Sequence, residues 1–423
     1  MSLLSFHYHI NGKKNNEFFK ESFQKSCLAD FKKTIESDEI GFFRLSKNQK
    51  NISDVQKLVA DFSHKKHFVQ IGIGGSALGP QMLISSLAKS TDKTFSLFDN
   101  IDSDYLTKEL EKISLKNSIF YVVSKSGGTA ETIACYSIIR NHLIKEGISE
   151  KEFKDFFVFC TDPENGQLRE HVLKNNYRSL SIEENIGGRF SVLSPVGLFP
   201  ACFMGIDIEK LYIGANQLHQ DILSDQFSNN PLLQTASSLI SLLPECHETV
   251  MMPYSSQLRD FSFWFVQLWA ESLGKFSEES KTEVGLTPIP AYGATDQHAQ
   301  MQLFMEGPKN KCIFMLNIKN KNTNFSLDSG LELEAAKKLE KFTMNELIEA
   351  EYQGSLMALK ENSRNVISID ISELTEESLA ELILFFECLT CVIGQYLKIN
   401  PFNQPGVEKG KKYTFEYLNS LRK

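Results

Sequence analysis

Short β-branched or aromatic runs alternate with stretches of helical periodicity along most of the chain. The runs that predict strands span 67–73, 95–99, 119–124, 156–160, 248–254, 312–318 and 365–371. Alternation of this kind predicts an α/β protein with mostly parallel sheets that are covered by helices on both faces. Because residues 200–245 are mostly helical in pattern, two α/β domains are the simplest interpretation.

The same pattern predicts a division of the chain into five parts. These are 1–50 as an N-terminal arm or helical cap, 51–205 as the first domain, 206–245 as a helical connection, 246–398 as the second domain, and 399–423 as a C-terminal turn and helix.

Composition narrows the classes of function. The 423 residues are 42% hydrophobic, enough for sizeable cores, and the formal net charge is -8. Nucleic acids are held by clustered Lys and Arg, so we expect no nucleic-acid partner. Small anions stay possible because they need only a local pocket.

Eight scattered cysteines indicate a reduced, intracellular protein. Cys388 and Cys391 are spaced as one face of a helix, and the apolar run 379–397 that holds them includes Glu381 and Glu387. A buried core helix therefore suits this run better than a membrane span. The chain start carries no secretory pattern, so we expect a cytoplasmic protein without a membrane partner.

Two glycine-rich junctions follow predicted strands in the first domain. Residues 72–79 fit G-x-G-x-x-A, and Asp99 follows at about the spacing of a dinucleotide site. A nicotinamide dehydrogenase is therefore one alternative. Residues 124–129 (SKSGGT) offer three hydroxyls, a cation and free amides before a helix, as a phosphate site does. A capped turn that binds nothing is the other interpretation of this loop.

Three further segments carry candidate chemistry. In the predicted helix 255–275, Gln267 and Glu271 lie one turn apart, with Gly274 suited to a left-handed exit. A carboxylate of this kind can abstract a proton beside a carbonyl, although an ordinary surface glutamate has the same pattern. His298 is expected in the first turn of a helix capped by Thr295 or Asp296.

Paired glycines before Arg189 are expected to expose its guanidinium. Residues 400–411 predict a rigid turn that leads into a short amphipathic helix. The pairs His64 and His67, and His7 and His9, lack the further ligands of a metal site, so no metal is expected.

Six segments, in order from about Val69 to Lys412, resemble the glucose-6-phosphate isomerase family, also called the phosphoglucose isomerase family. They are GIGGSALGP (72–80), SKSGGTAET (124–132), GGRFSVLSPVGL (187–198), QLWAESLGK (267–275), GATDQHAQMQL (293–303) and NPFNQPGVEKGKK (400–412).

The resemblance implies two SIS-type three-layer α/β/α sandwich domains, and isomerisation between glucose 6-phosphate and fructose 6-phosphate without a cofactor. It implies that the sugar phosphate is bound by Ser76, Ser124, Lys125, Ser126 and Thr129. Supporting contacts would come from Gln267, Glu131 and Gln404.

The catalytic roles are also carried over by resemblance. Glu271 would shuttle a proton between carbons 2 and 1 through a cis-enediol, while Arg189 with Gly188 would stabilise the enediolate. His298 and Lys411 would open the sugar ring. In the family this histidine comes from a second subunit, which implies a homodimer with shared active sites.

The chain departs from the family pattern at Ser126, Leu193, Pro195 and Leu273. None of these positions carries a chemical step, but they leave the range of substrates open. A dehydrogenase would leave the second loop, Glu271 and Arg189 without a role. A sugar-phosphate sensor that regulates transcription would need a basic helix-turn-helix, and none is visible.

Overall fold

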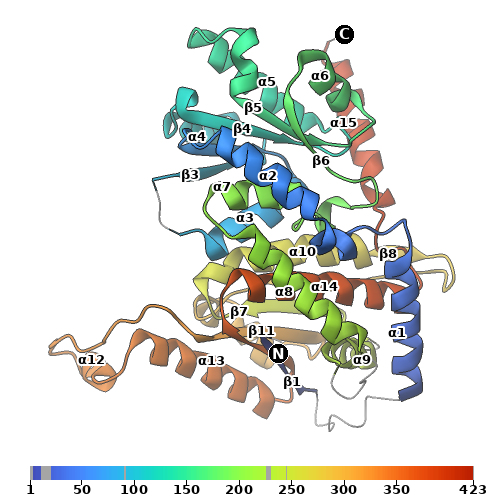
Figure 1. Ribbon diagram of the computed structural model, residues 1–423. Helices are drawn as coiled ribbons and strands as arrows, with labels where there is room; N and C mark the ends of the chain where they lie inside the picture. The colour runs from blue at the N-terminus through green and yellow to red at the C-terminus, as the bar shows by residue number, and fades with distance from the viewer. Residues whose placement is uncertain (1–2, 11–20, 90–91, 225–229, 244, 423) are drawn as a thin grey trace.

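Two five-stranded sheets organise the computed structural model, which describes residues 3–10, 21–89, 92–224, 230–243 and 245–422 (Figure 1). Their helices are α1 (Glu21–Glu36), α2 (Gln49–Asp61), α3 (Leu78–Leu87), α4 (Ser103–Glu111), α5 (Ala130–Lys145), α6 (Gln167–Asn175), α7 (Pro195–Phe203), α8 (Ile208–Leu223), α9 (Pro231–Leu242), α10 (Arg259–Leu273), α11 (Met301–Glu306), α12 (Glu334–Leu339), α13 (Met344–Glu361), α14 (Glu376–Tyr396) and α15 (Glu408–Ser420).

The first sheet is parallel throughout. In spatial order its strands are β3 (Thr94–Phe98), β2 (His67–Ile71), β4 (Ser118–Val123), β5 (Phe157–Thr161) and β6 (Arg178–Ser181). Every residue of β4 and β5 is buried, as expected for a parallel sheet with helices on both faces. The four strands predicted for this half are confirmed, whereas β6 is too short and polar to have been predicted.

The second sheet is parallel except at one edge. Its order is β1 (Leu4–His9), β12 (Asn365–Glu373), β11 (Lys311–Asn320), β7 (Glu248–Pro253) and β10 (Thr287–Pro290). The predicted strands here are confirmed as β7, β11 and β12. Strand β10 contains two prolines and was missed, but prolines are tolerated at an edge, where they remove no inter-strand hydrogen bond that the sheet needs.

Strand β1 was not predicted either, because residues 1–50 were expected to form an arm or helical cap. It pairs antiparallel with β12, with Leu4 opposite Ile371. This pairing joins segments more than 350 positions apart in the sequence, so no local pattern could reveal it. Residues 1–2 and 11–20 of the expected arm lie outside the described residues. The five-part division of the chain stays a prediction.

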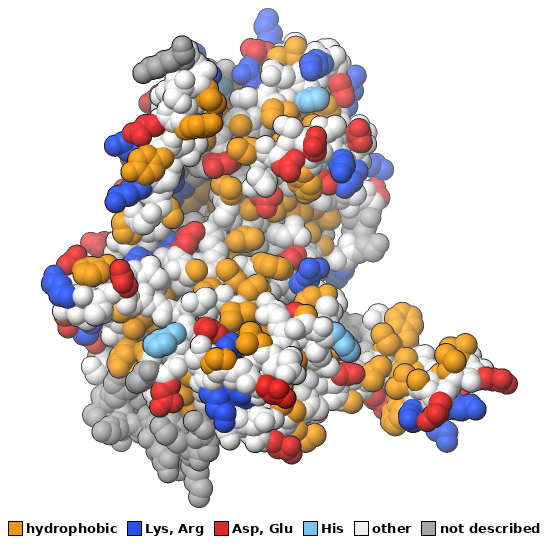
Figure 2. Space-filling model, turned by 180° about the vertical axis from the view of Figure 1, so that it is seen from behind, with side chains coloured by type: hydrophobic (Ala, Val, Ile, Leu, Met, Phe, Trp, Pro, Cys, Tyr) orange, Lys and Arg blue, Asp and Glu red, His pale blue; other side chains and the backbone are white. Residues whose placement is uncertain are grey.

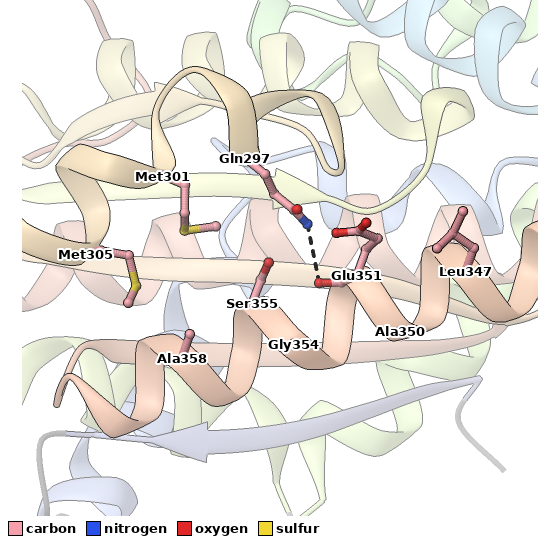
Figure 3. Close-up of a pocket in the computed structure, with 9 residues that line it drawn as sticks. All are labelled: Gln297, Met301, Met305, Leu347, Ala350, Glu351, Gly354, Ser355 and Ala358. Carbon is pink, nitrogen blue, oxygen red and sulfur yellow. Dashed lines mark hydrogen bonds between the residues drawn. The ribbon is translucent and has the colours of Figure 1, made fainter. Parts of the chain in front are cut away.

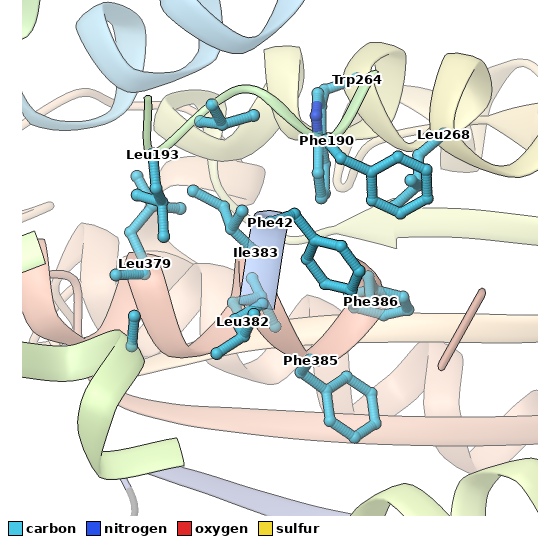
Figure 4. Close-up of a cluster of buried hydrophobic side chains, with 14 of the residues drawn as sticks. Phe42, Phe190, Leu193, Trp264, Leu268, Leu379, Leu382, Ile383, Phe385 and Phe386 are labelled. Carbon is cyan, nitrogen blue, oxygen red and sulfur yellow. The ribbon is translucent and has the colours of Figure 1, made fainter. Parts of the chain in front are cut away.

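A continuous apolar core joins the two sheets. Helix α10 packs against α3 and α14, and the ring centroids of Phe265 and Phe386 lie 5.4 Å apart. The same core holds Phe42 and Phe190, with centroids 4.9 Å apart (Figure 4). Helix α14 is buried from Ser378 to Gly394, which confirms that the apolar run is a core helix. Within the described ranges, no helix is long and apolar enough to cross a membrane.

Candidate active site

A cavity of about 800 Å³ opens where β2, β4 and β5 of the first sheet end. The carboxyl ends of parallel strands are the usual place for a ligand site in such sheets. Most of the predicted site residues line it, and two do not. Those that line it are Ser76, Ser124, Lys125, Ser126, Thr129, Gly188, Arg189, Gln267, Glu271, Gln404 and Lys411. Segments far apart in the sequence therefore converge on one cavity.

The loop 124–129 is shaped by its own hydroxyl groups. The Oγ of Ser124 lies 3.0 Å from Oγ1 of Thr129 and accepts a hydrogen bond from the Gly127 amide at 3.1 Å. Gly127 has a φ of +69°, which favours glycine. Thr129 makes no side-chain cap on α5, so the first amides of that helix stay available to an anion.

Lys125 ties this loop to the segment that precedes Gly188. Its Nζ donates to the carbonyl oxygens of Glu184 at 2.7 Å and Ile186 at 2.9 Å. Burial lowers the pKa of Lys125, while the charges of Asp162 and Glu184 oppose that shift. The cation is thus held at the cavity wall by backbone groups.

The first glycine loop packs directly against the Arg189 segment. A Cβ at Gly75 would lie 2.2 Å from the carbonyl carbon of Gly188, and one at Gly74 would lie 2.9 Å from Nε2 of Gln267. In a dinucleotide site these close approaches serve the pyrophosphate. Here the space beside the two glycines is filled by the Gly188 backbone and the Gln267 side chain. In addition, Asp99 does not line the cavity. The geometry therefore disfavours the dehydrogenase interpretation.

Arg189 lies at the centre of the site, and the expectation of an exposed guanidinium is wrong, since its side chain is only 1% exposed. Its Nε donates to Oγ of Ser272 at 2.7 Å, and its Nη1 donates to Oε1 of Gln404 at 2.7 Å. Its Nη2 donates to the carbonyl oxygens of Pro401 and Asn403. Burial lowers the pKa of Arg189, while Glu271 opposes the shift.

Glu271 projects from the last turn of α10 and is 34% exposed, so its carboxylate reaches the cavity. Its Oε2 accepts from Nη1 of Arg189 at 3.2 Å, and its Oε1 accepts from Nε2 of Gln267 at 3.1 Å. The predicted shared face of Gln267 and Glu271 is confirmed. Gly274 does not make the predicted left-handed exit, because its φ is −77°.

The C-terminal turn reaches the cavity from the other end of the chain. Gln404 precedes the 3₁₀ helix η10 (Pro405–Val407), and Lys411 follows on α15. The Nζ of Lys411 lies 2.8 Å from Oε1 of Glu408 in an exposed ion pair. Lys411 therefore sits at the rim, with its charge in solvent.

Two predicted residues lie elsewhere. Glu131 is near the start of α5, and His298 is an exposed residue that ends the 3₁₀ helix η9 (Thr295–His298). Neither lines the cavity. The expected cap before His298 is wrong, because Asp296 accepts from the Tyr292 amide at 2.7 Å and η9 follows Ala294 without a side-chain cap.

Sequence reasoning missed several polar residues of the cavity wall. The cavity is also lined by Asp162, Asn165 and Glu184. Ser272 does not line it but accepts a hydrogen bond from Arg189. Asp162 and Asn165 come directly after the predicted strand 156–160. Their position at a strand's carboxyl end was a signal that could have found them.

A second cavity of about 500 Å³ lies between α11 and α13 (Figure 3). Met301 and Met305 face α13 across it, and Nε2 of Gln297 donates to the carbonyl oxygen of Glu351 at 3.3 Å. Among the described residues that line it, Glu351 is the one charged side chain. The first cavity, by contrast, is lined by several charged and polar side chains, so it is the better candidate for an active site.

Comparisons with known proteins identify the family. The family model described as "Phosphoglucose isomerase" matches residues 56–423. A glucose-6-phosphate isomerase of Carboxydothermus hydrogenoformans is 35% identical, and the match covers 96% of this chain and 90% of that protein.

Solved structures share the fold. A hypothetical protein of Thermus thermophilus is similar with a TM-score of 0.91 and 30% identity, over 98% of this chain and all of that one. A putative tagatose-6-phosphate ketose/aldose isomerase of Clostridium novyi shares the fold alone, with a TM-score of 0.51 and 14% identity, over 94% of this chain and 95% of that one. The predicted fold, with two mostly parallel sheets like those of SIS-type phosphosugar isomerases, is confirmed. The chain belongs to the phosphoglucose isomerase family.

Proposed function

We propose that the protein interconverts glucose 6-phosphate and fructose 6-phosphate, and that Glu271 transfers the proton. The observation that carries the proposal is the setting of Glu271. Its carboxylate is held by Arg189 and Gln267 in a cavity that the loop 124–129 also lines.

The phosphate is anchored by the loops at the ends of β2 and β4. Hydroxyls of Ser76, Ser124, Ser126 and Thr129 and the amides at the start of α5 bind its oxygens, and the charge of Lys125 lies beside them. Anchoring at this end leaves the other end of the open-chain sugar beside Glu271. Because both reacting carbons then meet one carboxylate, a single base can serve both.

The reaction begins with ring opening, for which His298 and Lys411 exchange protons with the ring oxygen and the hydroxyl at carbon 1. Glu271 then removes the proton from carbon 2 and returns it to carbon 1 of the cis-enediol, while the oxygen at carbon 2 loses its hydroxyl proton and the oxygen at carbon 1 gains one. Negative charge moves from the carboxylate to the enediolate oxygens during this step. Arg189, with the amide of Gly188, stabilises that charge, and a fixed cation of this kind lowers the barrier by several kcal/mol.

Two residues keep the charged groups in place. Gln404 accepts from Arg189, and Gln267 donates to Glu271. Since Arg189 is buried and bonded on all three nitrogens, it needs little reorganisation when charge develops.

The protein acts as a homodimer with shared active sites. His298 is exposed and lies outside the cavity of its own chain, which supports donation to a second copy. A projecting segment around α12 also exposes apolar side chains, including Phe325 at 71% and Leu333 at 62% (Figure 2). Surfaces of this kind are typical of contacts between proteins. Eight free cysteines fit a cytoplasmic site of action.

The proposal is tested by incubating the purified protein with fructose 6-phosphate and a chelator, without a nicotinamide cofactor. The reaction is stopped, and glucose 6-phosphate is measured separately. We expect equilibration of the two sugars. If fructose 6-phosphate stays unchanged, the proposed activity is wrong.

A further inference from the structure

Lys275 makes contacts that bear directly on Glu271, although it does not line the cavity. It begins the short strand β8 (Lys275–Ser277), directly after the end of α10. Its Nζ donates to the backbone carbonyl oxygens of Glu271 at 2.7 Å and Ser272 at 2.9 Å. The last carbonyls of a helix lack partners within it, so this ammonium completes the helix end.

The path of the chain explains why the side chain folds back. Gly274 is extended, with a φ of −77° and a ψ of 94°, and leads straight into β8. A Cβ at this position would lie 3.0 Å from the carbonyl oxygen of Ala270. The glycine thus allows a tight exit that brings Lys275 against the turn bearing Glu271.

The charge of Lys275 also belongs to the electrostatics of the site. Burial and the positive charge of Arg189 lower the pKa of Lys275 to about 8, while Glu271 opposes the shift. On the paired strand β9 (Thr282–Val284) the residue opposite is the uncharged Val284. Among the described residues, Arg189 and Glu271 are the charged groups that shift the pKa of this ammonium.

We propose that Lys275 is a positioning residue for Glu271, which fixes the last turn of α10 and places a positive charge at the helix end that carries Glu271. Glu271 is then held at three points: its two carboxylate oxygens bond Arg189 and Gln267, and its backbone oxygen bonds Lys275. Lys275 touches neither substrate nor the reacting atoms. The inference rests on the proposed role of Glu271 as the base.

The test compares Lys275→Met, Lys275→Arg and the wild type across the pH range in which each stays folded. Met keeps the apolar stem but removes the charge. We expect kcat to fall by about tenfold or more with a smaller change in KM, because the base is less well oriented.

Lys275→Arg keeps the positive charge and should keep most of the wild-type kcat. Its guanidinium does not titrate in this range, so an alkaline limb that begins near pH 8 in the wild type should move upward. Lys338→Met is a matched control, because it removes the same charge from an exposed pair with Glu334 on α12. Its pH profile should equal that of the wild type.

A wild-type kcat in Lys275→Met would show that the lysine does not position the base, and would overturn the inference. Should that variant fail to fold, Lys275→Arg decides: an alkaline limb that stays near pH 8 contradicts the inference. A Glu271→Gln variant in the same series separates the two proposals. If it turns over normally, the assignment of the base fails, whatever Lys275 does.

Discussion

Arg189 donates from its Nη1 to Oε2 of Glu271 at 3.2 Å, although the two residues are 82 positions apart. The arginine is buried and the carboxylate is partly exposed. The cation is therefore fixed by the protein, while the carboxylate keeps access to the cavity. This arrangement suits a step in which negative charge leaves Glu271 and must be stabilised close by.

Replacing Glu271 by Gln should lower kcat by at least about a hundredfold, because the amide cannot accept the proton. Binding of a substrate analogue that carries the phosphate should change little, since the loop 124–129 is untouched. Steady-state kinetics and calorimetric titration measure the two effects. Glu278→Gln, at an exposed position beyond β8, is the control. Turnover close to that of the wild type in Glu271→Gln would remove Glu271 from this role.

Arg189→Lys should lower kcat by about a hundredfold or more, even though the charge is kept. An ammonium cannot reproduce the planar fork that reaches Ser272, Gln404 and Glu271 together. The free energy of unfolding should also fall, by about 1–3 kcal/mol, because buried acceptors lose their donor. Kinetics and urea unfolding test this pair of effects. Retained activity in Arg189→Lys would show that charge alone is sufficient.

The proton-transfer route predicts an isotope label. Fructose 6-phosphate converted in heavy water should give glucose 6-phosphate with deuterium at carbon 2, because the proton held by Glu271 exchanges with solvent before it returns. Proton NMR of the product measures the incorporation. Conversion without any label, under conditions that exclude direct transfer within the sugar, argues against the enediol.

Shared sites predict complementation between two inactive chains. In a dimer of one His298→Ala chain and one Glu271→Gln chain, one site keeps both native residues and the other loses both. Random mixing should therefore restore about a quarter of the wild-type activity. The measurement is activity after the chains are unfolded and refolded together, with tagged heterodimers isolated as proof of assembly. Heterodimers that are formed but inactive would contradict the shared site.

His219 should make stability depend on pH far from the active site. It stacks on Phe43 with ring centroids 3.9 Å apart, and burial lowers the pKa of His219 to about 4. Between this value and its ordinary value of 6.5, the unfolded chain binds a proton that the folded chain does not. Stability should therefore fall as the pH drops through this range, by up to about 3 kcal/mol.

Urea unfolding at pH 7 and at about pH 5 measures that loss. His219→Phe keeps a ring against Phe43 and should reduce the difference between the two pH values. His64→Phe, at an exposed position, should leave the difference as it is. Equal acid sensitivity in wild type and His219→Phe would rule out His219 as its source.

The sequence by itself determined most of the secondary structure and the chemistry-bearing segments. Alternating apolar runs predicted β2, β4, β7 and β12, and the glycine, serine and threonine content of residues 124–129 predicted an anion-binding turn. Such features depend on residues close to one another in the chain, so local periodicity and turn chemistry reveal them. The six ordered motifs extended this to the family and to the residues of the site.

The tertiary structure decided how those segments meet. Arg189 was expected in solvent but is buried, because its partners come from α10 and from a turn more than two hundred positions away. His298 lies outside the cavity, and β1 pairs with β12 across nearly the whole chain. Contacts of this kind arise from packing between distant segments, which leaves no period or spacing in the sequence. Of the three contacts that hold Glu271, the one with Arg189 is of this kind, and only the folded chain reveals it.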